Sequence, residues 1–238
     1  MKKKSIKTIL ILVVLFFLPV VFLLFLYPAT HNYDPLEIVN EDVTDLQFFA
    51  SDNEEDILLK EHITILGFLG NRPMEYATAA LNLKELVYDK FKGFKRFQIV
   101  MILPKGAKEK AQALKKEISK YEDLRFWHFV YGEPNDIETL FESLKIEEQL
   151  SKELATDHVF IIDKELKQRG RLDDREDNEI EKEEPIYKLF SYDCIEVAEI
   201  KNKMSDDLRI LFTEYRQKRK GKFDSSSRRA EDLNAEEN

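Results

Sequence analysis

Two kinds of apolar pattern divide the chain. Residues 8–27 form one uncharged and mostly apolar segment, whereas the remainder alternates short apolar runs with segments whose apolar residues recur every three or four positions. At about 1.5 Å of rise per residue, a helix of about 20 residues spans about 30 Å, which is the thickness of a bilayer's hydrocarbon core. The first pattern therefore predicts a transmembrane helix, and the second predicts strands and amphipathic helices.

Apolar runs of strand length predict the sheet. Three nearly continuous runs are typical of strands covered on both faces, and a fourth run alternates between apolar and polar residues. Two hairpins are also expected, the first around the turn-like Ser51-Asp52-Asn53. The continuous runs are 62–69, 96–103 and 159–162, the alternating run is 124–130, and the hairpin arms are 46–49 with 57–59 and 166–172 with 186–190.

Periodic segments between these runs predict four helices. Pro73 suits the first turn of the first helix, and Asn135 or Asp136 can cap the third. Strands that alternate with helices imply parallel strands joined by right-handed crossovers, and the last hairpin adds an antiparallel edge. The order predicts an α/β, thioredoxin-like fold with a mixed central sheet and helices on both faces. The four helices are expected at 73–91, 107–121, 135–144 and 197–215.

Charge around the apolar segment predicts its orientation. Lys2, Lys3, Lys4 and Lys7 precede it, and residues 28–59 contain no Lys or Arg. This asymmetry favours a cytoplasmic N-terminus and a globular part in the periplasm or another extracytoplasmic space. A cleaved signal peptide is the alternative, but its apolar region usually covers about 7–15 residues. We therefore favour an uncleaved signal anchor.

Composition sets the remaining domain boundaries. We expect a cytoplasmic N-terminus at 1–7, the transmembrane helix at 8–27, a polar tether at 28–44, the thioredoxin-like domain at 45–216 and a disordered charged tail at 217–238. All 46 acidic residues follow the transmembrane segment together with 33 of the 37 basic ones, so the part after it carries a net charge of −13. This charge argues against nucleic acid as a main partner.

Cys194 is the only cysteine of the chain. One thiol excludes an internal disulfide, a CxxC redox pair and a metal site with several cysteines. Asp193 and Glu196 are close in sequence and should raise the pKa of this thiol, so a small structural hydrophobe is expected.

The four histidines show no zinc-binding spacing. They are His31, His62, His128 and His158, without an i, i+4 pair or an HExxH sequence. An ordinary hydrogen-bonded role is expected for each. Topology alone also allows His62 and His158 to meet at neighbouring strand ends.

Two charged segments have no catalytic pattern. Residues 173–184 contain eight acidic residues but lack the spacing and the glycine of a calcium loop, which predicts a solvated loop or an electrostatic docking surface. The basic segment 216–229 is expected to be a soluble tail, with anionic lipid or an acidic partner as the alternative.

The later part of the chain resembles a known family. The sequences "ATDHVFIIDKELKQRGRLDD" and "SYDCIEVAEIKNKMSDDLRILFTEY", with the anchor and the first hairpin, are similar to the Sco family over roughly residues 42–216. Sco proteins are membrane-anchored thioredoxin-fold proteins associated with copper delivery to cytochrome oxidase. Their working motif is Cys-Pro-x-x-x-Cys or a close relative, placed after the first core strand at the start of the first helix.

The motif is degenerate here. Its place reads "GFLGNRPMEY", so Arg72 and Tyr76 stand where the resemblance puts the two cysteines, and Pro73 keeps the proline. His158 matches the third copper ligand of the family. Cu(I) prefers soft thiolate ligands, and disulfide exchange requires a thiolate. One ligand of three is retained.

The loss of the cysteine pair predicts a protein without an enzymatic activity. The favoured function is a membrane-anchored scaffold or assembly factor for an envelope or respiratory-complex protein, with no cofactor. The alternatives are a weak copper metallochaperone that uses His158 with His62, Met74 or Tyr76, and an enzyme with thiol-independent chemistry around Arg72. Arg72 itself either is solvated or paired with Glu75, or binds an anion at the helix start.

Overall fold

The computed structural model describes residues 6–26, 35–52, 55–120 and 123–220, and it consists of two compact units, Met1–Asp34 and Pro35–Asn238. The first unit contains helix α1 (Ile6–Leu26), with Pro19 inside it. Among the described residues, no helix combines the length and the hydropathy that a membrane crossing requires. The transmembrane helix expected at 8–27 stays a prediction.

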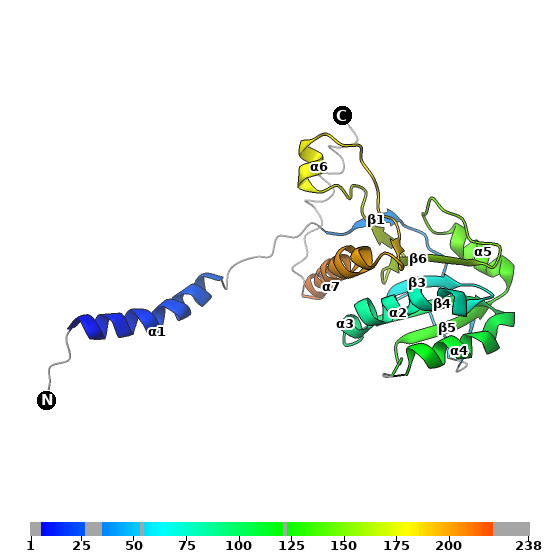
Figure 1. Ribbon diagram of the computed structural model, residues 1–238, viewed down its shortest axis with the longest axis horizontal. Coiled ribbons are helices and arrows are strands. Elements are labelled where there is room, and N and C mark those ends of the chain that lie inside the picture. The colour runs from blue at the N-terminus through cyan, green and yellow to red at the C-terminus, as the bar shows by residue number, and fades with distance from the viewer. Residues whose placement is uncertain (1–5, 27–34, 53–54, 121–122, 221–238) are drawn as a thin grey trace. The chain divides into compact units, whose positions relative to one another are not determined.

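The second unit is built on one mixed sheet (Figure 1). Its strand order is β1-β7-β6-β3-β4-β5-β2, and β8 pairs with β6 beside this path. The neighbours β3, β4 and β5 are parallel, whereas the other pairs are antiparallel. The strands are β1 (Glu37–Asn40), β2 (Ala50–Ser51), β3 (Ile63–Leu69), β4 (Phe97–Pro104), β5 (Trp127–Gly132), β6 (Ala155–Ile162), β7 (Gln168–Gly170) and β8 (Tyr192–Asp193).

The helices of this unit include short segments of 3-10 and π geometry. The 3-10 segments are η1 (Pro73–Tyr76) and η3 (Lys105–Ala107), and the π segments are η2 (Lys84–Tyr88) and η4 (Glu199–Met204). The α-helices are α2 (Ala77–Leu83), α3 (Asp89–Phe91), α4 (Lys108–Ile118), α5 (Pro134–Glu142), α6 (Asp177–Glu181) and α7 (Ser205–Arg219).

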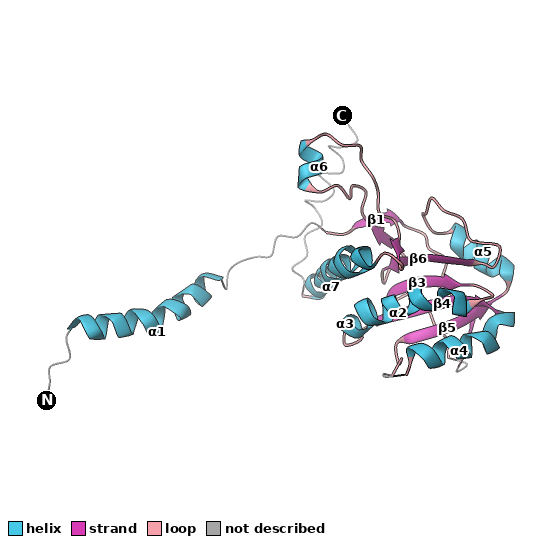
Figure 2. Cartoon of the chain, in the orientation of Figure 1, coloured by secondary structure: helices cyan, strands magenta, loops and turns pink. Residues whose placement is uncertain are grey.

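Two hydrophobic cores lie on opposite faces of the sheet. The helices that pack beside the sheet can be followed in Figure 2. The first contains buried residues of α2, α4 and α7, such as Leu83, Leu114 and Leu208. The second contains Ile137 and Leu140 of α5. The steps from β3 to β4 and from β4 to β5 run in one direction, so right-handed crossovers put α2 and α4 on the same face. The order β4-β3-β6-β7 is that of a thioredoxin-like core, which confirms the predicted fold class.

The structure corrects the first predicted hairpin. Strand β2 pairs with β5 and not with residues 57–59. The Asp45 carboxylate accepts hydrogen bonds from the backbone N–H groups of Leu46 at 2.8 Å and of Leu59 at 2.7 Å. These bonds close a loop where the sequence pattern predicted two paired strands. Asn53 of the predicted turn lies outside the described residues.

Only the first of the two strands predicted for the second hairpin is present as a strand. Residues 168–170 form β7, but residues 186–190 make a single bridge, between Leu189 and Arg171. The next strand is β8, which pairs with the middle of β6. The acidic run 173–184 is not an irregular loop throughout, because α6 lies within it. The side chain of Glu176 caps α6, and the Glu179 side chain bonds back to the cap residue.

Three predicted boundaries also shift. The expected tether at 28–44 includes β1, which pairs with β7, and the buried side chains of Val39 and Val43. Residues 217–219 of the expected tail continue α7, whereas 221–238 lie outside the described residues. The cap of α5 is Glu133 rather than Asn135 or Asp136, because Pro134 occupies the first turn.

Candidate functional site

Gly70 sets the backbone path from β3 into the motif segment. Its φ is +59°, and a Cβ added there would lie 2.1 Å from the carbonyl oxygen of Glu153. Only glycine therefore fits this left-handed turn without displacing the chain. The backbone N–H of Asn71 donates to the same Glu153 oxygen at 2.9 Å. This turn places Arg72 at the start of η1.

Arg72 is paired with two carboxylates. Its Nη1 lies 3.2 Å from Glu75 Oε1, and its Nη2 lies 3.7 Å from Glu153 Oε1. The side chain is 57% exposed, so each pair contributes little to stability. Of the two interpretations of Arg72, the structure shows the paired one.

The other motif positions divide between core and surface. Pro73 is buried at the first turn of η1, and Tyr76 packs against the first hydrophobic core. Met74 is 48% exposed. Proline and tyrosine therefore hold the segment on the domain, while Arg72 and Met74 form its outer surface.

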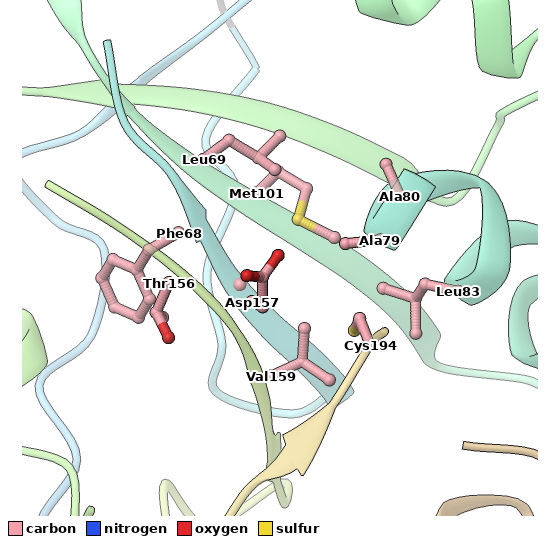
Figure 3. Close-up of a pocket in the computed structure, with 11 residues that line it drawn as sticks. Phe68, Leu69, Ala79, Ala80, Leu83, Met101, Thr156, Asp157, Val159 and Cys194 are labelled. Carbon is pink, nitrogen blue, oxygen red and sulfur yellow. The ribbon is translucent and has the colours of Figure 1, made fainter. Parts of the chain in front are cut away.

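A small pocket lies between the sheet and α2, the helix that follows this segment in the chain (Figure 3). Its empty volume is about 230 Å³, which includes its open mouth. Apolar side chains such as Leu83 and Met101 make most of its wall, and the Asp157 carboxylate and the Cys194 side chain also line it. Burial, followed by the nearby charge of Asp193, raises the pKa of Asp157.

Cys194 is held as an inert thiol. Its side chain is 1% exposed, and its backbone N–H donates to the Asp157 carbonyl oxygen at 3.0 Å. Asn82 Nδ2 donates to the Cys194 carbonyl oxygen at 2.9 Å. Burial, and then the charges of Asp193 and Asp157, raise the pKa of the thiol well above its ordinary value. A protonated, buried thiol is a poor nucleophile.

His158 points to the other face of the sheet. Side chains alternate along β6, so Val159 joins the core beneath α2, whereas Phe160 joins the core beneath α5. His158 shares the parity of Phe160. Its Nδ1 lies 3.0 Å from Ser191 Oγ, and its Nε2 lies 3.1 Å from Glu148 Oε2.

These placements separate the predicted copper ligands. Thr64 of β3 pairs with Ile162 of β6, so His62, two residues before Thr64, lies level with position 164. His158 is six residues away from that position along the chain. At about 3.3 Å per residue this separation is roughly 20 Å, so the two histidines, which topology alone allowed to meet, lie far apart. Neither histidine joins Arg72 or Tyr76.

The residues at the motif position do not fit copper. They offer a guanidinium and a phenol in place of two thiolates, and His158 turns away from them. Among the described residues, no group of three or more His, Cys, Asp or Glu side chains is arranged to hold a metal ion. No chemical step is assigned to copper here.

Sequence reasoning missed a buried charge network on β7. Arg169 Nε lies 2.7 Å from Asp163 Oδ2, and its Nη2 lies 2.7 Å from Glu214 Oε1. Arg171 Nη2 lies 2.8 Å from Asp207 Oδ1. The sequence contained a signal for this network. Arg169 and Arg171 are two residues apart, which places them on one face of a strand, and Asp207 and Glu214 are seven apart, which places them on one face of a helix.

No family model matches the sequence, and no curated protein matches it. Similar solved structures include BsSco, described as a member of the Sco family of cytochrome c oxidase assembly proteins, at 14% identity and a TM-score of 0.45, covering 74% of this chain and 98% of that one. The soluble domain of Sco1 from Bacillus subtilis is 16% identical, with a TM-score of 0.40 over 73% of this chain and 92% of that one. Copper-bound ScoI from Arabidopsis thaliana is 10% identical, with a TM-score of 0.41 over 71% of this chain and 98% of that one. The family named from the sequence is thus the one found among these structures, and at such TM-scores the likeness assigns no activity, metal or partner.

Proposed function

We propose that the chain is a membrane-anchored, Sco-like protein without catalytic activity or a bound cofactor, and that it acts as a scaffold or assembly factor. One observation supports this function above others. A thioredoxin-like sheet carries, at the position of the reactive motif, an ion-paired Arg72 and a packed Tyr76, while the only thiol, Cys194, is buried elsewhere. The architecture is kept, and the groups for thiol chemistry are replaced.

The membrane anchor rests on the sequence. The apolar residues 8–27 have lysines only on their N-terminal side, which favours a cytoplasmic N-terminus and an extracytoplasmic domain. A scaffold held at a membrane acts on other membrane or envelope proteins. The resemblance to the Sco family suggests respiratory-complex biogenesis as the process.

The outer surface of the motif segment is the proposed contact. Met74 is exposed beside the Arg72–Glu75 pair, so an apolar and adaptable side chain stands next to charged ones. Such a surface suits protein recognition without a reactive group. The copper alternative has no observation in its favour, because His158 contacts Ser191 and Glu148 on the opposite face.

Site-specific photo-crosslinking tests this proposal. A photoreactive residue replaces Met74 in the full-length protein in its native membrane, and the matched control replaces the exposed Glu109 of α4. We expect a covalent adduct with an envelope protein from position 74 that position 109 does not give. Absence of an adduct at 74, or the same adduct from both positions, contradicts a scaffold that binds through this segment.

A further inference from the structure

A cationic surface with an exposed aromatic ring lies at the sheet end where β3 and β4 begin. We call it the basic edge and define it by Phe94, Lys95, Arg96, Lys164 and Arg219. Backbone hydrogen bonds bring its loops together. The Arg96 carbonyl oxygen accepts from the N–H of Ile63 at 2.8 Å, and the Lys164 carbonyl oxygen accepts from the N–H of Glu61 at 3.0 Å.

Phe94 presents an apolar ring at this edge. Its side chain is 45% exposed, and it stacks on Phe212 of α7 with ring centroids 4.3 Å apart. Phe212 in turn stacks on the buried Phe91 at 5.7 Å. The exposed ring is therefore held in place by the core rather than by the loop alone. Its position is fixed for contact with a partner.

The cations of the basic edge act on one another. The pKa of Lys164 is lowered by burial first, and the charges of Arg96, Arg219 and Lys95 lower it further. Glu61 opposes them as the nearby carboxylate. Among the described residues, no ion pair joins these four cations to an acid. In a chain of net charge −9, these four cations therefore form a compact cationic surface whose charge the Glu61 carboxylate offsets only in part.

We propose that the basic edge binds the surface of a bilayer that contains anionic phospholipids. Its cations contact the phosphates, and the Phe94 ring enters the headgroup region, as aromatic residues of interfacial proteins do. The inference rests on the membrane location proposed above. Eight residues, 27–34, separate α1 from the domain. Fully extended, such a segment reaches at most about 30 Å, so an anchored domain stays near lipid.

Headgroup quenching of a fluorescent label tests the proposal on the full chain. Gly93→Cys places the label beside Phe94, and Gly106→Cys is the matched control in η3, just before α4. A side chain at either glycine meets nothing within 4 Å. Cys194 is 1% exposed and stays unlabelled. Each protein is reconstituted in phosphatidylcholine vesicles with a spin-labelled headgroup lipid, with or without phosphatidylglycerol.

We expect quenching at position 93 and not at 106, and only in vesicles that contain phosphatidylglycerol. The variant Lys95→Glu/Arg96→Glu should lose it, with roughly fivefold weaker contact for each cation removed. The control Lys105→Glu/Lys108→Glu changes net charge equally and should keep the quenching. Lys105 lies with Gly106 in η3, and Lys108 is the first residue of α4.

Three outcomes contradict the proposal. Quenching that is equal at 93 and 106, or equal in both vesicles, shows proximity without recognition. A label at 93 that is unquenched by anionic vesicles but responds to poly-glutamate shows an acidic polypeptide as the ligand instead. A label at 93 that responds to neither anionic vesicles nor poly-glutamate shows that the basic edge is not a binding site for either. Flotation with neutral vesicles separately reports anchoring, so failure of the anchor and failure of the basic edge are distinguishable.

Discussion

Arg169 and Glu214 form a fully buried ion pair between β7 and α7. Their Nη2 and Oε1 atoms lie 2.7 Å apart, and both side chains are 1% exposed. Arg169 also binds Asp163 and the carbonyl oxygen of Leu36, so one guanidinium joins the closing helix, the sheet and the segment that enters the domain. A buried charge of this kind is costly when it loses a partner.

Replacing Arg169 by Met should therefore strongly destabilise the domain. The change leaves the carboxylates of Asp163 and Glu214 buried without their main partner, and the expected loss in the free energy of unfolding is about 3–5 kcal/mol. Denaturant titration of the full-length protein measures it. Arg72→Met is the control, because this side chain is 57% exposed and its loss should cost about 0.5 kcal/mol or less. Equal effects of the two variants contradict the importance of the buried pair.

Gly70→Ala should destabilise the domain because of the backbone at the end of β3. The left-handed φ of +59° and the Glu153 oxygen, which would lie 2.1 Å from an alanine Cβ, leave no room for a side chain. The expected cost is about 1–3 kcal/mol. Gly106→Ala, which meets nothing within 4 Å, should stay within about 0.5 kcal/mol of the wild type. Thermal unfolding of both variants compares them, and a neutral Gly70→Ala contradicts the turn described here.

The free energy of unfolding should decrease as the pH is lowered, because His128 becomes protonated. Burial is the main cause that lowers the pKa of this histidine below 6.5 in the folded state. The unfolded chain therefore binds a proton more readily, so folding free energy is lost as the pH falls through 6.5 and towards the folded pKa. The variant His128→Gln should show a shallower decline than the wild type in this range. His62, whose pKa is also lowered mainly by burial, contributes in the same direction. A slope that His128→Gln leaves unchanged contradicts this assignment.

Cys194 should resist thiol reagents in the native protein. Its side chain is 1% exposed and its thiol is kept protonated. Its modification should therefore be slow and should require opening of the native structure. Gly106→Cys supplies an exposed thiol in the same chain as the control, and it should react at once. Rapid reaction of the native Cys194 contradicts the inert role.

Local patterns predicted the central architecture well. Continuous apolar runs gave β3 and β4, because strands buried on both faces have few polar residues, and the repeats through Leu83 and Leu114 gave the helices that cover them. The prediction that Pro73 lies in the first turn of the first helix was also correct, since Pro73 begins η1 shortly after β3. These features depend on residues close in sequence.

Long-range pairing was not predictable in the same way. The run 186–190 has strand composition, but β6 pairs with β8 instead, and only Leu189 reaches the sheet. The face of His158 depends on the register of β6, in which a shift of one residue exchanges the two faces. The match of Arg169 with Glu214 requires knowledge of which helix covers β7. Each of these facts comes from tertiary packing.

Titration of the full-length protein with Cu(I), against a competing chelator, tests the central claim most directly. Arg72→Cys/Tyr76→Cys, which returns two sulfur ligands to the motif position, is the positive control. We predict no submicromolar binding by the wild type, because Arg72 and Tyr76 supply no thiolate and His158 faces away. Submicromolar binding by the wild type that His158→Ala abolishes would contradict the claim that this protein has lost the copper site.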